Sequence, residues 1–294
     1  MLSTFATAET DAHRICSAGS AWLERFGDDL LLSYQNEAAR DIVLGGLDGW
    51  IAEHGWKPRR VFGKFIPMQN AERIAPELLE GETGLPLDTV VRESGIRFAL
   101  DFAAGYSAGL FIDQRANRAL VRQNGVRRLL NTFAYTCSFS VVAALAGAET
   151  VSIDLSKKSI DRGRANFALN QIDPQPHQFI ADDVLDVLPR LARRGETFDA
   201  IILDPPTFSR GNQGRRFQVE QNFEELLALA LDVATPRARL LLSTNCTRLA
   251  RRELERIGRF ALKLRRRAGE FHAEPALPDF PPQTGAQTLW LTLK

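Results

Sequence analysis

The stretch Val126-Arg-Arg-Leu-Leu-Asn-Thr-Phe-Ala-Tyr-Thr-Cys-Ser-Phe139 joins a short strand pattern to a tight loop of small and hydroxylated residues. Residues 140–147, rich in Val, Ala and Leu, continue it as the start of a helix. A strand that runs through such a loop into a helix leaves unpaired backbone N–H groups, and the positive end of the helix dipole, beside a crevice. We therefore expect a ligand-binding loop here.

An acid follows this loop at the end of the next predicted strand. Val151-Ser-Ile-Asp154 is a short apolar run that ends in a carboxylate. It lies about 20 residues after the loop, the spacing at which an acid after the second strand of a doubly wound fold reaches a ribose hydroxyl. Asp154 could instead cap the helix that begins near Ser156, which is a common role of Asp. We favour ribose binding, and so predict an adenosine-like ligand.

Strand and helix patterns alternate from Val126 to the end of the chain. The predicted strands are residues 128–133, 150–154, 177–181, 200–204, 240–244 and 288–293. The predicted helices are residues 140–146, 158–170, 184–194, 220–234 and 251–260. This alternation predicts an α/β domain over residues 126–294, with a mainly parallel sheet and helices on both faces. Within it, residues 236–239 are expected to form a turn, and the proline-rich residues 273–285 a loop over the sheet edge.

The first 95 residues predict a separate small α+β lobe, either a platform for a substrate such as RNA or simple packing. Its expected elements are strands at residues 29–35 and 60–66, a helix at 38–54 ended by Gly55, and a loop at 70–88. Residues 96–125 are expected to be a hairpin and connecting segment. The hairpin pairs residues 90–91 with 96–102 through a turn at Ser94-Gly95, and a polar helix runs from 113–115 to about residue 123.

Composition excludes few functions. The chain has 294 residues and a net charge of +1, so it has no overall attraction to nucleic acid or membrane, although arginines are dense between residues 248 and 267. Cys16, Cys137 and Cys246 have no disulfide or zinc spacing, which fits a reducing cytoplasm and predicts no metal site. Residues 1–19 lack a signal-peptide core, and no apolar run approaches a membrane span. We expect a cytoplasmic protein without a membrane partner.

The first loop lacks both glycine-rich phosphate-binding motifs. Residues 134–139 contain neither G-x-G-x-x-G nor G-x-x-x-x-G-K-[ST]. Side chains that can form hydrogen bonds stand there instead: Asn131, Thr132, Tyr135, Thr136 and Ser138. Such a loop suits a ligand that carries no phosphate.

The most specific signal is Ile201-Ile-Leu-Asp-Pro-Pro-Thr-Phe208. Two prolines make the backbone after the strand rigid and extended, and neither has an N–H group. The backbone carbonyls and the Asp204 carboxylate would then face the crevice, with Phe208 available to stack on a planar base. A simple strand-ending turn is the alternative. Asp182-Asp183-Val184 follows the third strand similarly, where one carboxylate could receive an adenine amino group while the other caps the next helix.

Together these segments resemble the class I S-adenosylmethionine-dependent methyltransferases. The residues that carry the resemblance are Asn131-Thr-Phe-Ala-Tyr-Thr136, Asp154, Asp182-Asp183 and Asp204-Pro-Pro-Thr-Phe-Ser209. More narrowly, they are similar to bacterial 23S ribosomal RNA methyltransferases, which modify C5 of cytosine or N7 of guanine. The similarity includes residues 109–115, which in this group precede the core and help close the cofactor pocket. It covers roughly residues 90–245 and implies a Rossmann-like, mostly parallel seven-stranded sheet that binds S-adenosyl-L-methionine.

The resemblance implies a role for individual residues. The methionine end of the cofactor would meet Phe133, Tyr135 and Thr136, and Asn131 is a further expected cofactor-binding residue. Asp154, with Leu155 and Ser156 beside it, would hold the ribose, and Asp182, Asp183 and Val184 would meet the adenine. The acceptor would face the catalytic residues Asp204, Pro205, Pro206 and Phe208, and Asp204 would also contact the cofactor. Gln114 and Arg115 would lie over the pocket.

Two departures from the family matter. Members usually have glycine where this chain has Cys137-Ser138, so the loop backbone is expected to run differently. Members that methylate C5 of cytosine carry a nucleophilic cysteine in a Ser-Cys-Ser after the fifth strand, because C5 needs covalent activation. Here Cys246 lies about two residues past that place, so the resemblance favours guanine N7 and makes Cys246 a bystander.

The resulting hypothesis is a methyltransferase that acts on RNA, with 23S ribosomal RNA as its expected partner. No appended RNA-binding domain of the kind found in relatives is recognisable, and the arginines of residues 248–267 could contact RNA or form a solvated face. Two alternatives stay open: a methyltransferase with a protein or small-molecule acceptor, and a non-catalytic cofactor-binding RNA partner. The sequence leaves the oligomeric state unknown.

Overall fold

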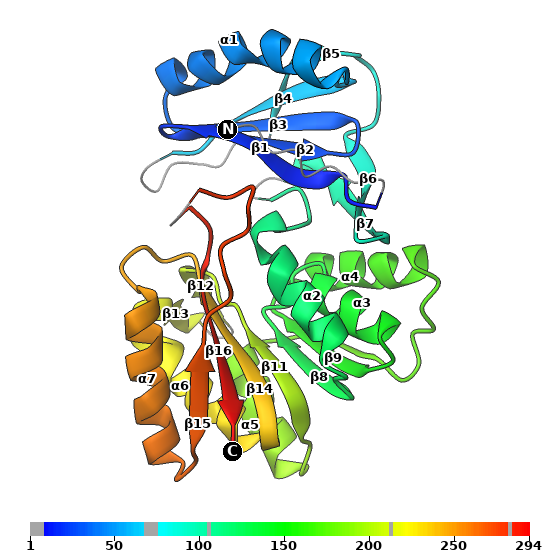
Figure 1. Ribbon diagram of the computed structural model, residues 1–294. Helices are drawn as coiled ribbons and strands as arrows, with labels where there is room; N and C mark the ends of the chain where they lie inside the picture. The colour runs from blue at the N-terminus through cyan, green and yellow to red at the C-terminus, as the bar shows by residue number, and fades with distance from the viewer. Residues whose placement is uncertain (1–8, 68–75, 105–106, 212–213, 282–283) are drawn as a thin grey trace. The chain divides into compact units, whose positions relative to one another are not determined.

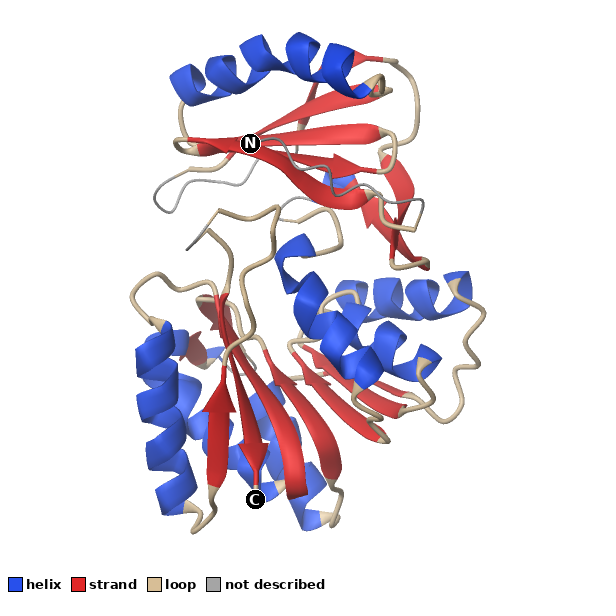
Figure 2. Ribbon diagram, in the orientation of Figure 1, coloured by secondary structure: helices blue, strands red, loops and turns tan. Residues whose placement is uncertain are grey.

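The computed structural model describes residues 9–67, 76–104, 107–211, 214–281 and 284–294 (Figures 1 and 2). The chain forms two compact units: residues 1–112 with 277–281, and residues 113–276 with 282–294. The division differs from the expected one, because the hairpin belongs to the first unit and the polar helix to the second. Residues 277–281 were expected to belong to a loop over the sheet edge of the α/β domain, but they belong to the first unit. There Asp279 accepts a hydrogen bond from the Arg14 backbone N–H at 3.1 Å, and the Arg14 guanidinium lies 4.1 Å from the Phe280 ring centre.

The first unit contains a five-stranded sheet in the order β1-β2-β3-β4-β5, covered by one helix, and a separate hairpin of β6 and β7. The bounds are β1 Ala12–Ala18, β2 Ala21–Phe26, β3 Asp29–Tyr34, α1 Glu37–His54, β4 Arg60–Phe65, β5 Glu77–Gly81, β6 Asp88–Glu93 and β7 Ile96–Asp101. The predicted helix, its Gly55 cap with a φ of 60° and the hairpin are confirmed. Of the loop predicted over residues 70–88, residues 70–75 lie outside the described residues, and the rest was wrong in part because β5 lies in it. Its residues are mostly exposed on both faces, so they lack the alternation that marks a strand.

A buried ion pair holds two neighbouring strands of the first unit together. The fully buried Asp29 of β3 accepts hydrogen bonds from Arg60 of β4 at 2.9 and 2.6 Å, and from Arg59 at 3.1 Å. Burial alone would raise the pKa of Asp29, but the hydrogen bonds from Arg60 and Arg59 outweigh it and lower the pKa below its usual value. The carboxylate therefore stays ionised inside the sheet.

Asp29→Ala is expected to destabilise the first unit by about 3–5 kcal/mol, because Arg60, only 2% exposed, loses its charged partner. Urea unfolding followed by tryptophan fluorescence measures this, since Trp22, Trp50 and Trp56 all lie in the first unit. Asp41→Ala is the matched control, because it removes an ion pair with Arg40 at the surface and should cost less than about 1 kcal/mol. Equal losses in the two variants would contradict the prediction.

The second unit is built on a seven-stranded sheet in the order β10-β9-β8-β11-β14-β16-β15. The first five strands run parallel, and β16 and β15 pair antiparallel, which confirms the predicted mostly parallel sheet. The strand bounds are β8 Arg128–Thr132, β9 Glu149–Asp154, β10 Gln178–Ala181, β11 Phe198–Leu203, β14 Ala234–Thr244, β15 Gly269–His272 and β16 Gln287–Leu293. The expected turn at residues 236–239 was wrong, because β14 already begins at Ala234.

Helices cover both faces of this sheet, as the alternation predicted (Figure 1). Their bounds are α2 Arg115–Gln123, α3 Ser138–Leu145, α4 Lys157–Leu169, α5 Val184–Arg193, α6 Val219–Asp232 and α7 Arg251–Leu264. Successive residues of β11 point to opposite faces. Ile202 packs in one buried cluster with side chains of α2 and α3. Ile201 and Leu203 pack in another with side chains of α5, α6 and α7.

A short two-stranded ribbon follows β11 and was not expected from the sequence. It pairs β12 Phe208–Arg210 with β13 Arg216–Gln218 antiparallel, directly after the Asp-Pro-Pro segment. None of the helices described is long and apolar enough to cross a membrane. Among the described residues, no group of three or more His, Cys, Asp or Glu side chains is placed to hold a metal ion.

Candidate active site

Strand register brings the predicted acids to one edge of the second unit's sheet. Ala181 pairs with Asp154, Ile153 with Thr132, and Thr132 with Leu203, so the parallel strands β10, β9, β8 and β11 end level. Asp154 is the last residue of β9. The residues that directly follow β10, β8 and β11 are Asp182, Phe133 and Asp204. Neighbouring strands lie about 4.8 Å apart, so the edge from β10 to β11 spans about 14 Å. That length suits an extended nucleoside.

The first loop has an unusual backbone for a chain without glycine there. Phe133, Tyr135 and Cys137 adopt the left-handed conformation, with φ of 51°, 48° and 60°. Each costs roughly 1–2 kcal/mol for a non-glycine residue. Three N–H groups of this loop have partners within the protein: Ala134 donates to the Ile153 carbonyl, Tyr135 to Asp154 and Cys137 to the Ala134 carbonyl. The loop backbone was expected to differ from that of relatives with glycine there. Instead, residues with side chains adopt the left-handed conformation that glycine favours.

Asp154 holds this loop in place. Its two carboxylate oxygens accept hydrogen bonds from the Tyr135 N–H and the Ser156 N–H, both at 2.8 Å. Burial raises the pKa of Asp154, although these two N–H groups oppose the shift. Ser156, not Asp154, caps α4, since its hydroxyl accepts from the Ser159 N–H at 3.2 Å. The alternative role of Asp154 as the helix cap was wrong.

A buried polar layer lies under the loop and accounts for two predicted site residues. The Asn131 side chain donates to the Ser140 hydroxyl at 2.9 Å, which in turn bonds Ser152 at 2.8 Å. The Thr136 carbonyl accepts from the Asn166 side chain at 3.0 Å. Both Asn131 and Thr136 are at most 2% exposed. They support the loop from beneath.

Cys137 fills the space between the loop and α4. A Cβ atom on Gly163 of α4 would lie 2.3 Å from the Cys137 Sγ atom, so helix and loop touch without room for a methyl group. Burial raises the pKa of the Cys137 thiol to about 12, which keeps it protonated and unreactive.

Gly163→Ala is therefore expected to destabilise the second unit by about 1–3 kcal/mol through overpacking. Cys137→Gly should restore the room, and glycine adopts the left-handed conformation of residue 137 without strain. The C137G/G163A double variant should then recover more than half of the loss in thermal unfolding. Additive effects of the two substitutions would contradict direct contact between these residues.

The two acids after β10 are engaged within the protein. Asp183 caps α5, because its carboxylate accepts from the Leu185 N–H at 2.9 Å. Asp182 forms an ion pair with Arg190. Val184 is buried in the core and offers a ligand only its backbone. Gly211 packs so closely on Asp183 that an added Cβ would lie 2.0 Å from its second oxygen.

Asp204 ends β11 at the other side of the site. Burial raises its pKa to about 6; a hydrogen bond from Ser243 and the positive charge of Arg118 oppose this, while the negative charge of Asp113 adds to it. The Gln114 side chain donates to Asp204 at 3.3 Å and to the Ser243 hydroxyl at 2.9 Å. Ser243, at the end of β14, was not predicted, although it is the last but one residue of a predicted strand at this same edge.

The other acceptor-side residues differ in exposure. Pro205 is buried and Pro206 exposed, while Phe208 of β12 has 47% of its surface accessible. Phe217 of β13 packs against Phe133 with ring centres 5.5 Å apart, which places the ribbon beside the first loop. Arg115 is only 6% exposed at the start of α2, so it is a packed side chain rather than a mobile cover.

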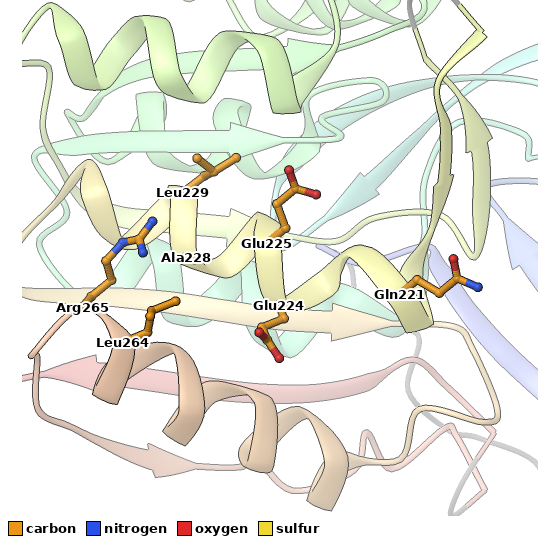
Figure 3. Close-up of a pocket in the computed structure, with 7 residues that line it drawn as sticks. All are labelled: Gln221, Glu224, Glu225, Ala228, Leu229, Leu264 and Arg265. Carbon is orange, nitrogen blue, oxygen red and sulfur yellow. The ribbon is translucent and has the colours of Figure 1, made fainter.

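A hollow of the second unit lies away from these acids. It is lined from α6 and α7 by Gln221, Glu224, Glu225, Ala228, Leu229, Leu264 and by the adjoining Arg265 (Figure 3). None of these residues lies at the strand ends that carry Asp154 and Asp204. The strand ends are the better candidate site because the carboxylates of Asp154, Asp182 and Asp204 all lie there.

A family model described as S-adenosylmethionine-dependent methyltransferase matches residues 52–292. The chain belongs to this family. The match covers the second unit almost completely and confirms the resemblance found from the sequence.

Several curated relatives of this methyltransferase are named as methyltransferases of large-subunit ribosomal RNA. The ribosomal RNA large subunit methyltransferase I of Aeromonas hydrophila is 30% identical over 256 residues, which are 82% of this chain and 62% of that protein. The ribosomal RNA large subunit methyltransferase K/L of Psychrobacter cryohalolentis is 39% identical over 164 residues, 54% of this chain and 21% of that protein. The chain thus spans less than two thirds of the length of either relative.

Solved structures share the fold of the methyltransferase. SMU.776, complexed with SAH, has a TM-score of 0.83 at 24% identity and covers 97% of this chain and 76% of that chain. A SAM-dependent methyltransferase from Agrobacterium tumefaciens has a TM-score of 0.75 at 23% identity, covering 100% of this chain and 92% of that chain. These similarities confirm the Rossmann-like fold.

The lone pairs of Asp154 fit the cofactor of this family. A carboxylate has about four acceptor sites. The loop N–H groups use one on each oxygen, so each oxygen keeps another for one of two ribose hydroxyls. The edge also lacks the glycine-rich motif that a diphosphate needs, as expected for S-adenosylmethionine.

Proposed function

We propose that this protein transfers a methyl group from S-adenosylmethionine to RNA of the large ribosomal subunit. The convergence of Asp154, Asp182 and Asp204 on one sheet edge carries the proposal for the site. The names of the relatives support RNA as the acceptor.

In this proposal the site divides along the sheet edge. Asp154 binds the ribose, with Leu155 and Ser156 beside it, and the loop of Phe133, Tyr135 and Thr136 lies against the methionine part. The adenine lies against residues 182–184. The Asp183 carboxylate caps α5, and the Asp183 N–H donates to Asp182 at 2.8 Å, so these acids also fix the backbone on which the base lies. Gln114 and Arg115 form the wall beside the acceptor.

We propose guanine N7 as the acceptor atom rather than cytosine C5. Methylation of C5 requires a free thiolate. The Cys246 thiol is 4% exposed and donates to the Glu220 carboxylate at 3.1 Å, while Arg248 pairs with the same oxygen at 2.6 Å. A cysteine enclosed in this way supports a structural role.

The chemistry asks the protein mainly for alignment. The sulfonium of the bound cofactor supplies an electrophilic methyl carbon, and N7 attacks with its own lone pair, so no general base is needed. The ionised Asp204 can accept hydrogen bonds from the N1–H and amino group of a guanine. Phe208 can stack on the base, as aromatic residues do when they bind unpaired RNA bases. Water is excluded by Pro205 and the packed wall behind it.

The ribbon offers a better RNA contact than α7. Arg210 and Arg216 are exposed on β12 and β13, next to Phe208. Within the arginine-rich residues 248–267, Arg256 and Arg259 pair with acids of their own helix α7, and Arg265 pairs with Asp232. These pairs favour the solvated-face interpretation for much of residues 248–267. We propose that the ribbon contacts RNA phosphates.

The test is methyl transfer from labelled cofactor to ribosomal RNA, followed by separate ribonuclease and protease digestion and mass spectrometry of the nucleosides. We expect 7-methylguanosine. Label that survives ribonuclease but not protease would favour a protein acceptor, and 5-methylcytidine would overturn the N7 assignment. If the protein binds S-adenosylhomocysteine tightly but transfers no methyl group to RNA, protein or small molecules, the result would favour the alternative hypothesis of a non-catalytic, cofactor-binding RNA partner.

A further inference from the structure

A chain of hydrogen bonds connects the last strand of the sheet to Asp204. The indole N–H of Trp290 in β16 donates to the Asn117 Oδ1 atom at 2.9 Å. The Asn117 side-chain amide donates to the Gln114 Oε1 atom at 2.8 Å. Gln114 in turn donates to Ser243 and to Asp204. Every member except Asp204 is at most 3% exposed, so water does not compete for these bonds.

The direction of this chain follows from chemistry. An indole N–H can only donate, so Asn117 must turn its oxygen toward Trp290 and its amide N–H toward Gln114. That donation turns the Gln114 oxygen to Asn117 and its N–H groups to Ser243 and Asp204. Because Ser243 accepts from Gln114, its own proton is free for Asp204. One donor-only group thus sets the orientation of three side chains.

We propose that Trp290 and Asn117 are positioning residues that act through Gln114 and Ser243 to hold one side of the Asp204 carboxylate, leaving the other side for the acceptor base. The acceptor part rests on the proposed function; the hydrogen-bond relay does not. Because N–H and O–H donors favour the ionised form of a carboxylate, the relay also keeps Asp204 a hydrogen-bond acceptor near neutral pH.

Other charges around Asp204 come from the same part of the second unit. Asp113 disfavours and Arg118 favours its ionised form. Asp113 is itself fixed, since its carboxylate accepts from the Ala286 N–H at 3.0 Å. The buried Arg118 lies 5.8 Å from the Phe139 ring centre. Both charges belong to the surroundings of Asp204 that a change at Asn117 or Trp290 does not itself remove.

Asn117→Asp is the sharpest test because it changes one amide to a carboxylate of the same shape. That carboxylate can accept from Trp290 but cannot donate to Gln114. Gln114 must then rotate its amide, which turns its oxygen toward Ser243 and Asp204 and removes both donors from Asp204. We expect kcat for methyl transfer to fall about tenfold or more, with unchanged affinity for S-adenosylhomocysteine.

A second readout does not depend on activity. The stability difference between a protein and its D204N counterpart changes with pH until Asp204 is fully ionised in the folded state. The pH at which the difference levels off reports the pKa of Asp204. We expect this pH to lie about one unit or more higher in N117D than in the wild-type protein, since Asp204 loses both donors and gains a negative charge nearby.

Trp290→Phe removes the donor without adding a charge and should shift the levelling-off pH in the same direction. Phe198→Leu is the matched control: it shortens a buried aromatic side chain at the opposite end of β11 and should lower stability without moving this pH. An unmoved pH in W290F would overturn the relay, because N117D also adds a negative charge that raises the pKa of Asp204 by itself. A wild-type protein that methylates no RNA would overturn the proposed function, while the pH measurement would still decide on the relay.

Discussion

Asp154→Ala is expected to weaken S-adenosylhomocysteine binding about 100-fold or more. The carboxylate is assigned two tasks: it fixes the first loop through the Tyr135 and Ser156 N–H groups, and it receives the ribose. Its removal leaves two N–H groups without their partner and frees a loop with three left-handed residues to relax. Isothermal titration calorimetry on the purified variant measures the loss.

Two variants separate these tasks. Asp154→Asn keeps the shape and one acceptor oxygen, so it should bind more tightly than the alanine variant but more weakly than the wild-type protein. Asp161→Ala is the control, because it removes a carboxylate that pairs with Lys157 on the exposed side of the neighbouring helix. We expect binding there to stay within about twofold. Binding by Asp154→Ala within threefold of wild type would show that the ribose lies elsewhere.

The α/β core could be predicted from the sequence because its signals are local. Buried parallel strands such as Ile201-Ile-Leu203 are apolar on both faces and end at once in an acid and two prolines. Parallel strands end at the same edge, so acids after successive strands were expected to meet there. The residues Asp154, Asp182 and Asp204 do so.

The support around the acids could not be predicted, because it depends on residues far apart in the chain. Nothing near Trp290 indicates that its indole meets Asn117. Spacing alone offers a weak signal for Gln114 and Asn117, which lie three residues apart at the start of a helix. The left-handed loop was hidden for another reason. Glycine is the usual marker of that conformation, and here Phe133, Tyr135 and Cys137 adopt it instead.

Asp204→Asn is expected to reduce methyl transfer about 100-fold while S-adenosylhomocysteine binding stays within threefold, because we propose that the residue faces the acceptor rather than the ribose. An amide of the same shape replaces one acceptor oxygen by donors, which conflict with the N1–H and amino group of guanine. In the wild-type protein, transfer should rise with pH through about 6, as Asp204 ionises. A D204N variant with wild-type kcat would exclude this role.

The same variant should be more stable than the wild-type protein at alkaline pH. The pKa of Asp204 is about 6 in the folded state, against about 3.9 for an unfolded aspartate. The folded state therefore binds the proton more tightly. This contribution to stability is complete below about pH 4 and is lost as pH rises through 6, which leaves a cost of about 3 kcal/mol at pH 8. Asparagine has no charge to bury, so D204N should unfold at a higher temperature than wild type at pH 8 but not at pH 4.5. If the variant is more stable but transfers less methyl, Asp204 serves catalysis at a cost in stability. A carboxylate with a structural role would instead lower the stability when it is replaced.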